Sequence, residues 1–315
     1  MAKTYDGTKG VWIGTSGWTY DGCRGPFYPS DVPKKEWLAW YATRFASTEI
    51  NFSFYRTPSL EAVRAWRDQT PADFLFAWKA SKFITHWKRL NEHTCQNSLD
   101  LMATRLKALG RKAGPVLFQL PPQFEADQDR LANFLRMLPR RYLYAFEFRH
   151  PSWHGRDIIQ LLRQHNVSLC LSDHHHAPAP WIATATHVYI RGHGPGGRYK
   201  NNYPDGTLLE WSEDIRKWRR QGRTIFMFFD NDQKSAAPVD AKRLITILRT
   251  GTVRSKNTRS MPAARQVAMA SSRPCAAVPL VAESMVAPLR ICPSLLSGHW
   301  TGSFLGGPIG TLFKT

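Results

Sequence analysis

The sequence lacks the features of a membrane, secreted or disulfide-stabilised protein. No apolar run reaches the roughly 18–20 residues that a bilayer-spanning helix needs, and no apolar signal segment follows residues 1–4. The five cysteines are scattered, without a CxxC pair or the spacing of metal ligands. We therefore expect a cytoplasmic protein with reduced thiols and no membrane partner. The sequence leaves the oligomeric state open.

Two motifs of common α/β enzymes are also absent. Gly14-Thr15-Ser16-Gly17 follows the first apolar strand but matches neither GxGxxG nor a P-loop. No serine has the strand–turn–helix setting of a hydrolase nucleophile, and Cys170 lies within an apolar strand, where a thiol is more often part of the core. These absences argue against a dinucleotide-binding sheet and against serine or cysteine hydrolysis.

Acidic residues are scarce beside basic ones, 24 against 43, which gives a net charge of +19. Residues 251–315 hold seven of the Lys and Arg residues and a single acid, which leaves 36 basic and 23 acidic residues in the rest of the chain. A basic excess admits nucleic acid as a partner. The positive charges before residue 251 are spread among predicted helices rather than gathered in one run, so nucleic acid is not the favoured partner.

The chain does contain an alternation of short apolar strands with segments of helical period. Eight strands in about 240 residues, nearly all followed by helices, predict a (β/α)8 TIM barrel rather than an open doubly wound sheet. Only the connection after the sixth strand shows no clear helix. The predicted strands are Val11–Thr15, Thr48–Asn51, Phe74–Lys79, Val116–Leu120, Leu143–Phe148, Val167–Ser172, His187–Arg191 and Thr224–Phe229.

The predicted barrel domain covers residues 1–250. From Gly251 onward, Ser, Pro, Ala, Gly and Thr dominate and the hydrophobic periodicity ends. We expect residues 251–315 to be a low-complexity, basic and poorly ordered C-terminal extension. The sequence does not decide whether this extension is ordered, nor whether it arose by a frameshift or by read-through.

Polar residues follow the predicted strands at their carboxyl ends, where TIM barrels place their active sites. Three acids (Glu49, Glu147, Asp173) and three bases (Lys79, Arg149, Arg191) are expected to meet there. Such a balanced set could form ion pairs that cap the barrel, or it could line a ligand pocket, and the two alternatives can coexist. Further predicted pocket residues are Ser16, Trp18, Asn51, Tyr55, His86, Gln119, His150 and Asn231.

The favoured function is an enzyme acting on a small anionic substrate such as a sugar phosphate or a nucleotide-like compound. Arginine and lysine side chains suit phosphate and carboxylate groups, so Arg149, Arg191 and Lys79 are predicted to hold the anion. Glu49 or Glu147 would act as general acid or base, with Asp173 orienting. The reaction would be that of a hydrolase, lyase or isomerase on a phosphorylated or sugar substrate.

Other functions remain open on this evidence. The chain could be a nucleic-acid-binding protein or nuclease, a carbohydrate-active hydrolase that uses Glu49 and Glu147 as paired carboxylates, or a ligand sensor without catalysis. No cofactor is required, although Glu49, Glu147 and Asp173 could hold a divalent metal ion. The run His174-His175-His176 is a weaker metal candidate, because consecutive residues of an extended segment point in alternating directions.

Several motifs together resemble the YecE-like family, also called domain of unknown function 72. They occur in order between about residues 11 and 248, and the resemblance implies a TIM barrel without implying an activity. Asp230 departs from the asparagine that the pattern leads us to expect, and the chain after about residue 250 has no counterpart in it. The matching segments are Gly14–Trp18, Glu49–Asn51 with Phe54–Arg56, Lys79–Ser81 with Thr85–His86, Phe118–Pro122, Glu147–His150 with Trp153, Arg191–Gly194 and Phe229–Asp232.

Overall fold

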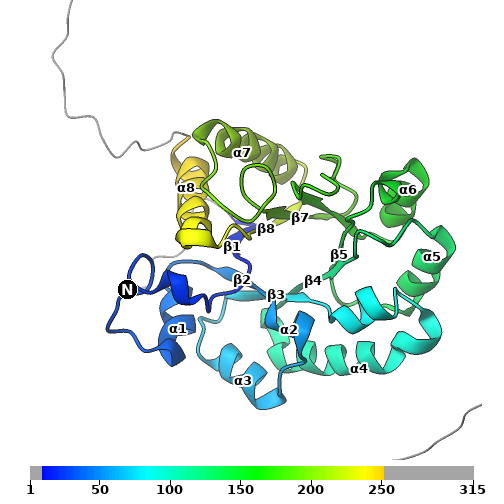
Figure 1. The fold of residues 1–315 in the computed structure, drawn as a ribbon, viewed down its shortest axis with the longest axis horizontal. Helices are drawn as coiled ribbons and strands as arrows, with labels where there is room; N and C mark the ends of the chain where they lie inside the picture. Colours follow the sequence, from blue (N-terminus) through cyan, green and yellow to red (C-terminus); the bar gives the residue numbers. More distant parts are fainter. Residues whose placement is uncertain (1–8, 252–315) are drawn as a thin grey trace, which may run out of the picture. The chain divides into compact units, whose positions relative to one another are not determined.

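The computed structural model describes residues 9–251, in which eight parallel strands form a barrel surrounded by helices (Figure 1). The strands follow one another in the sheet in the order β1-β8-β7-β6-β5-β4-β3-β2. The predicted TIM barrel is confirmed, whereas the predicted C-terminal extension from residue 252 on lies outside the described residues. The strands are β1 (Val11–Thr15), β2 (Ser47–Ile50), β3 (Leu75–Lys79), β4 (Ala113–Gln119), β5 (Tyr144–Glu147), β6 (Ser168–Ser172), β7 (His187–Gly192) and β8 (Thr224–Phe229).

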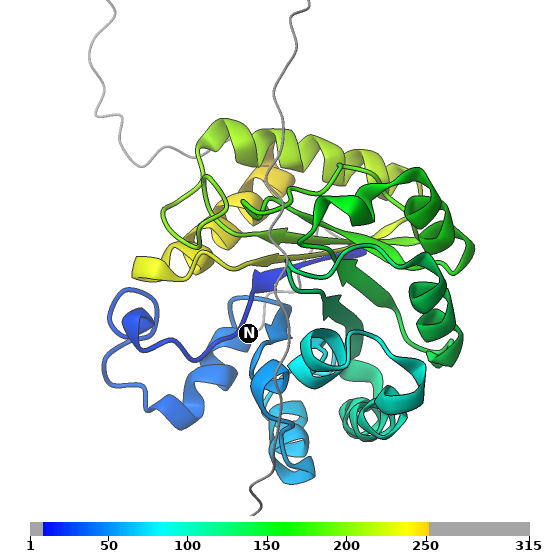
Figure 2. The ribbon, with the colours of Figure 1, turned by 45° about the vertical axis from the view of Figure 1, so that its right-hand side comes forward.

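Helices lie outside the ring of strands in both views, with α7 beside α8 (Figures 1 and 2). As predicted, the connection between β6 and β7 contains no helix. None of the described helices is long and apolar enough to cross a membrane. The helices are α1 (Trp37–Ala42), α2 (Phe52–Tyr55), α3 (Leu60–Asp68), α4 (Glu92–Leu109), α5 (Gln128–Met137), α6 (Arg156–Gln164), α7 (Asp205–Arg220) and α8 (Ala236–Thr250), and a π-helical turn spans Phe83–Trp87.

Side-chain caps fix where several helices begin. The Ser59 hydroxyl accepts from the backbone N–H of Ala62 at 3.2 Å, so α3 starts at Leu60. Asp127 caps α5 in the same way, because its carboxylate accepts from the Arg130 N–H at 2.9 Å. These caps satisfy amide groups that have no partner within the helix.

Apolar side chains fill the barrel below its carboxyl end. Trp12 of β1 stacks on Phe226 of β8, with ring centroids 5.3 Å apart, towards the amino end. This stack belongs to a small buried cluster inside the barrel, against which Trp12 packs. Its buried members are Ala77, Leu117, Ala145, Cys170, Tyr189, Phe226 and Phe228. The larger core lies between the strands and the outer helices. Both cores bury apolar area, which is the main favourable term in folding.

Between β1 and β2 the barrel is closed by hydrogen bonds to a tyrosine side chain rather than by a full ladder of backbone hydrogen bonds. The Tyr41 hydroxyl accepts from the Thr15 N–H at 2.8 Å and donates to the Ser47 carbonyl at 3.0 Å. Beyond it, one bridge joins Ser16 to Glu49. Gly14 is required at this seam, since a Cβ there would lie 1.9 Å from the Ser47 carbonyl oxygen. The seam brings Ser16 and Glu49 together at the barrel's carboxyl end.

Candidate functional site

A layer of polar side chains replaces the apolar filling at the carboxyl end of the barrel. In most strands the polar residue comes two positions after an inward-facing apolar one, as Lys79 follows Ala77 and Arg191 follows Tyr189. All eight members are buried. We call them the polar layer: Ser16, Glu49, Lys79, Gln119, Glu147, Ser172, Arg191 and Asp230.

The Arg191 guanidinium is fully buried in this layer and uses all three of its nitrogens. Nε and Nη2 donate to the two oxygens of Glu49 at 3.1 and 2.9 Å. Nη1 donates to Glu147 at 2.8 Å, and Nη2 also donates to Asp230 at 2.7 Å. Ser16 and Tyr189 complete the network through the Glu49 carboxylate, at 2.8 and 2.5 Å. Arg191 therefore binds protein carboxylates, which argues against the predicted role of holding an anionic ligand.

Glu49 and Glu147 are held in their ionised form. Burial raises the pKa of each carboxyl, but the charges of Arg191 and Lys79 outweigh this for Glu49, and those of Arg149 and Arg191 do so for Glu147. The pKa of Glu49 is lowered, and that of Glu147 lies well below its usual range. Carboxylates so paired accept protons poorly. Because Arg191 lies between the two, the arrangement also argues against a glycoside-hydrolysing pair.

His193 adds an imidazole beside Glu147. Its backbone N–H donates to Asp173 Oδ1 at 2.7 Å, and its Nδ1 lies 3.3 Å from the same oxygen. Its Nε2 accepts from Arg191 Nη1 at 3.0 Å, so the proton of the neutral ring is placed on Nδ1. The Tyr203 hydroxyl donates to the other Asp173 oxygen. Asp173 thus positions His193 and lies outside the Arg191 network.

Lys79 is the cation of the polar layer without a close counter-ion. No carboxylate oxygen of residues 9–251 lies within 4.0 Å of its Nζ, which stands 4.6 Å from the centre of the Phe54 ring. Burial and then the charge of Arg191 lower the pKa of Lys79 to about 8, against the pull of Glu49, Asp230 and Glu147. An amine in this setting combines a cationic form with an accessible neutral form.

Arg149 and His86 flank the same region. Arg149 directs Nε and Nη2 at Glu147, at 3.0 and 2.9 Å, and 11 % of its side chain is exposed. His86, in the π-helical turn, packs edge-on against Phe54 with ring centroids 5.0 Å apart. Burial and then the charge of Lys79 lower the pKa of His86 to about 4, so its imidazole is neutral at physiological pH.

Two carboxyl groups follow β8 in quick succession. Asp230 is ion-paired with Arg191, whereas burial and then the negative charge of Asp230 raise the pKa of Asp232 well above its usual range. The three carboxylates of the polar layer form ion pairs with the two arginines, Arg191 and Arg149, and none of them lies within 4.0 Å of Lys79.

Residues 12–266 match the family described as "Protein of unknown function DUF72". The chain belongs to this family. The resemblance drawn from the sequence motifs is thereby confirmed. The match extends sixteen residues past the expected domain boundary at residue 250.

Curated relatives and solved structures of the DUF72 family agree with this assignment. The UPF0759 protein YecE of Escherichia coli K12 is 27 % identical and is matched over 63 % of this chain and 80 % of its own length. The UPF0759 protein YunF of Bacillus subtilis is 23 % identical over 76 % of this chain and 94 % of its own. A DUF72 family structure from Thermotoga maritima superposes with a TM-score of 0.69 at 25 % identity, covering 76 % of this chain and 98 % of that one.

The other predicted site residues of this DUF72 protein lie in varied surroundings. Trp18 packs edge-on against Trp66. His150 caps the turn Pro151–His154 through Ser152. Asn231 donates to the Asn201 carbonyl and to Asp240. Tyr55 is 69 % exposed beside Lys82.

Gln119 and Asn51 lie at the barrel mouth. Asn51 Oδ1 is buried without a hydrogen-bond partner among the described residues. A donor group of a ligand would satisfy this acceptor.

Three members of the site were not among the predicted residues, although the sequence carries a signal for each. His193 lies in the Arg-Gly-His-Gly segment after β7, two residues after Arg191. Asp230 comes two residues after the inward-facing Phe228, and Ser172 two residues after Cys170. The period of two therefore indicates Ser172 and Asp230 as inward-facing, and places Asp173 on the other face.

The predicted metal sites find no support in the geometry. Among residues 9–251 there is no group of three or more His, Cys, Asp or Glu side chains arranged to hold a metal ion. The oxygens of Glu49 and Glu147 face Arg191, and Asp173 faces His193 and Tyr203. In the histidine run, burial and then the charge of Arg149 lower the pKa of His174 to about 2.

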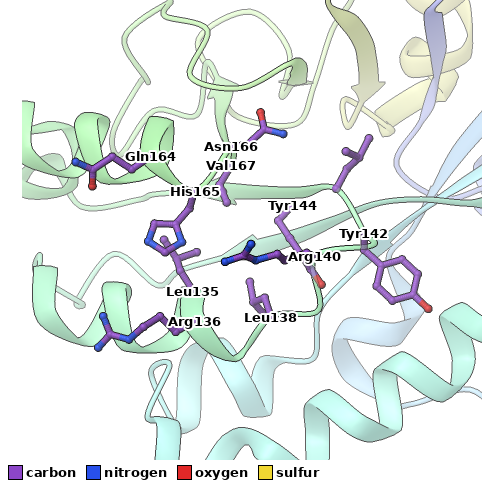
Figure 3. A pocket seen from close by; sticks show the side chains of 11 residues that line it. Leu135, Arg136, Leu138, Arg140, Tyr142, Tyr144, Gln164, His165, Asn166 and Val167 are labelled. Atoms are coloured by element: carbon purple, nitrogen blue, oxygen red, sulfur yellow. The ribbon is translucent and has the colours of Figure 1, made fainter.

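A cavity of about 700 Å³ lies at the opposite end of the barrel, before β5 and β6 (Figure 3). The side chains of Arg140 and His165 reach into it from the segments that precede these strands. No acidic residue lines it. TIM barrels place their chemistry at the carboxyl ends of the strands, so the polar layer remains the candidate active site of this DUF72 protein.

Proposed function

We propose that this DUF72 protein is an enzyme whose polar barrel mouth binds a small anionic substrate, such as a sugar phosphate or a nucleotide-like compound. The observation that carries the proposal is Lys79, a buried ammonium group that the surrounding carboxylates do not neutralise at close range. An uncompensated buried charge is costly. An anionic ligand at Lys79 would supply the missing counter-charge.

Arg149 extends this cationic surface. Its Nη1 makes no hydrogen bond with another described residue, while Nε and Nη2 are oriented by Glu147. A guanidinium fixed along one edge presents its remaining N–H groups in a set direction, which suits a phosphate or carboxylate. Lys79 and Arg149 are therefore the proposed anion contacts, and Arg191 with its carboxylates is the scaffold beneath them.

Thermal unfolding with added ligands tests the proposal. Ribose 5-phosphate and glucose 6-phosphate should each raise the unfolding temperature more than ribose and glucose do. A ligand that binds only the folded protein, present at a hundred times its Kd, raises the free energy of unfolding by about 2.7 kcal/mol. Lys79→Gln should abolish the difference and Arg149→Gln should reduce it. Lys107→Gln, on the exposed face of α4, is the control. Failure of both phosphates to stabilise the protein, or undiminished stabilisation of Lys79→Gln, would overturn the proposal.

A second candidate function, nucleic-acid binding, is favoured by a basic groove at the amino end of the barrel. The groove has a volume of about 440 Å³, and its lining includes Lys9, Arg216, Arg219, Arg220 and Arg223 but no acid. Two of these arginines also bind backbone carbonyls, those of Ile247 and Ala185. This candidate predicts binding of a single-stranded DNA 20-mer that weakens steeply between low and physiological salt and weakens further in Arg220→Gln. Salt-independent binding, or none, would exclude it.

A further inference from the structure

Lys79 differs from an ordinary anion-binding lysine in how its amine is held. Its backbone is fixed at the end of β3, where the carbonyl accepts from the Ser53 hydroxyl at 2.6 Å. Only 9 % of the residue is exposed, and Nζ lies on the face of Phe54. The neighbouring carboxylates of Glu49, Glu147 and Asp230 are bound to Arg191. This amine stands at the carboxyl end of the barrel, and no carboxylate of residues 9–251 forms an ion pair with it.

This environment makes the neutral, nucleophilic amine available near neutral pH. With the pKa lowered to about 8, about one amine in ten is neutral at pH 7, whereas an ordinary lysine with a pKa of about 10.4 is almost wholly protonated. Burial is the first cause of this shift, and desolvation of a lysine amine is one of the ways in which a nucleophilic lysine is activated. Lowered amine basicity and a fixed backbone are the two properties that a nucleophilic lysine needs.

His86 packs against the same aromatic side chain, Phe54, as the Lys79 amine, and its imidazole is a group that carries protons. The imidazole and the Lys79 amine both contact Phe54. The Thr85 hydroxyl donates to the Ser81 carbonyl at 3.3 Å and lies 2.9 Å from His86 Nδ1. The hydroxyl therefore accepts from Nδ1–H, which leaves Nε2 as the basic nitrogen of the neutral ring.

We propose that Lys79 forms a Schiff base with an aldehyde or ketone that carries an anionic group. The neutral amine adds to the carbonyl carbon, a C–N bond forms, and one of the two amine protons passes to the carbonyl oxygen, which becomes a hydroxyl. His86 then takes the second amine proton and delivers it to this hydroxyl as the C–O bond breaks, so that water leaves and a neutral imine remains. No oxidant or reductant is consumed. This inference rests on the proposed function, because Arg149 is required to hold the anionic group of the carbonyl compound.

Reductive trapping with pyruvate tests this step. The full-length protein is incubated with pyruvate and sodium cyanoborohydride, and the adduct is located by peptide mass spectrometry. We expect one reduced pyruvyl group on Lys79, formed about tenfold or more faster than on any other lysine, with a rate that rises with pH to a midpoint near 8. Acetone, which has no anionic group, should label Lys79 far more slowly.

Two variants keep the test decisive. Lys79→Arg retains a positive charge and should lose the adduct, whereas Lys82→Arg, a neighbouring lysine that contacts Tyr55 and Trp87, should retain it. If the sugar phosphates stabilise the protein through Lys79 and Arg149 but pyruvate labels Lys79 no faster than other lysines, the Schiff base is wrong and the proposed function stands. If neither the phosphates nor pyruvate engage Lys79, both proposals fail.

Discussion

Arg191 and Lys79 belong to the same polar layer but lie in opposite environments. Arg191 is surrounded by three carboxylates at 2.7–2.9 Å, and these charges raise its pKa well above the ordinary value even though burial opposes the shift. Lys79 has no such partner within 4.0 Å among the described residues, and burial lowers its pKa to about 8. Among residues 9–251, Arg191 therefore has its counter-ions at hydrogen-bond distance, whereas Lys79 has none within 4.0 Å.

The difference suggests separate roles for Arg191 and Lys79 within the polar layer. A buried ion pair that is fully hydrogen-bonded repays the desolvation of its members only while every member is present. The Arg191 network therefore reads as the scaffold of the site. Lys79 and the edge of Arg149 are the proposed ligand contacts, because a buried charge without a close counter-ion costs stability that a purely structural layer would avoid.

Replacing Arg191 should produce the largest loss of stability. Arg191→Met leaves the buried carboxylates of Glu49 and Glu147 without their shared cation, and removing one partner of such a network costs about 3–5 kcal/mol of unfolding free energy. Urea denaturation followed by circular dichroism measures the change. Lys34→Met, which breaks an exposed ion pair with Asp21, should change stability by no more than about 1 kcal/mol. Equal losses in both variants would contradict the scaffold role.

Glu147 should give the next largest effect, and the effect should depend on pH. The pKa of Glu147 is lower in the folded chain than in the unfolded one, so its stabilisation is present above about pH 4.3, the ordinary value for an unfolded chain, and is lost as the pH falls through the folded value. Glu147→Gln should cost about 2–3 kcal/mol at pH 7. The gap to the unmutated protein should narrow below pH 4. Glu210→Gln, on the exposed side of α7, should show no such convergence.

Asp230→Asn restores the residue that the family pattern leads us to expect, and its effect should be smaller. The Arg191 Nη2–H bond to position 230 remains possible through the amide oxygen, but the charge on the acceptor is lost, which corresponds to about 1–2 kcal/mol. Removing the charge should also lower the pKa of Asp232, since Asp230 helps to raise it. NMR titration of the Asp232 carboxyl carbon measures this shift. An unchanged pKa would show that the charge of Asp230 does not contribute to the raised pKa of Asp232.

The positions of the polar residues at the strand ends could be predicted from the sequence, but their hydrogen-bond and ion-pair partners could not. The alternation of strands and helices is a local pattern, so the barrel and the polar residues at its strand ends could be predicted from it. The period of two along a strand indicates Asp230, and not Asp173, as an inward-facing residue. The partners of Arg191 and the isolation of Lys79 could not be predicted, because they depend on the stagger of the strands and on rotamers. The Tyr41 seam between β1 and β2 likewise has no local signature.

The smallest predicted change is also the one that most sharply separates the two cations. Because the folded chain holds the Lys79 ammonium less favourably than water does, Lys79→Met should raise the unfolding free energy at pH 7, by about 1 kcal/mol. The folded pKa of Lys79 is below its unfolded value, so the unfolded chain binds more protons between about pH 8 and pH 10.4. Over that range the unmutated protein should gain stability relative to Lys79→Met, which chemical denaturation at several pH values measures. A loss of stability comparable with that of Arg191→Met would mean that Lys79 is a structural member of the ion-pair network, and its proposed role towards a ligand would fall.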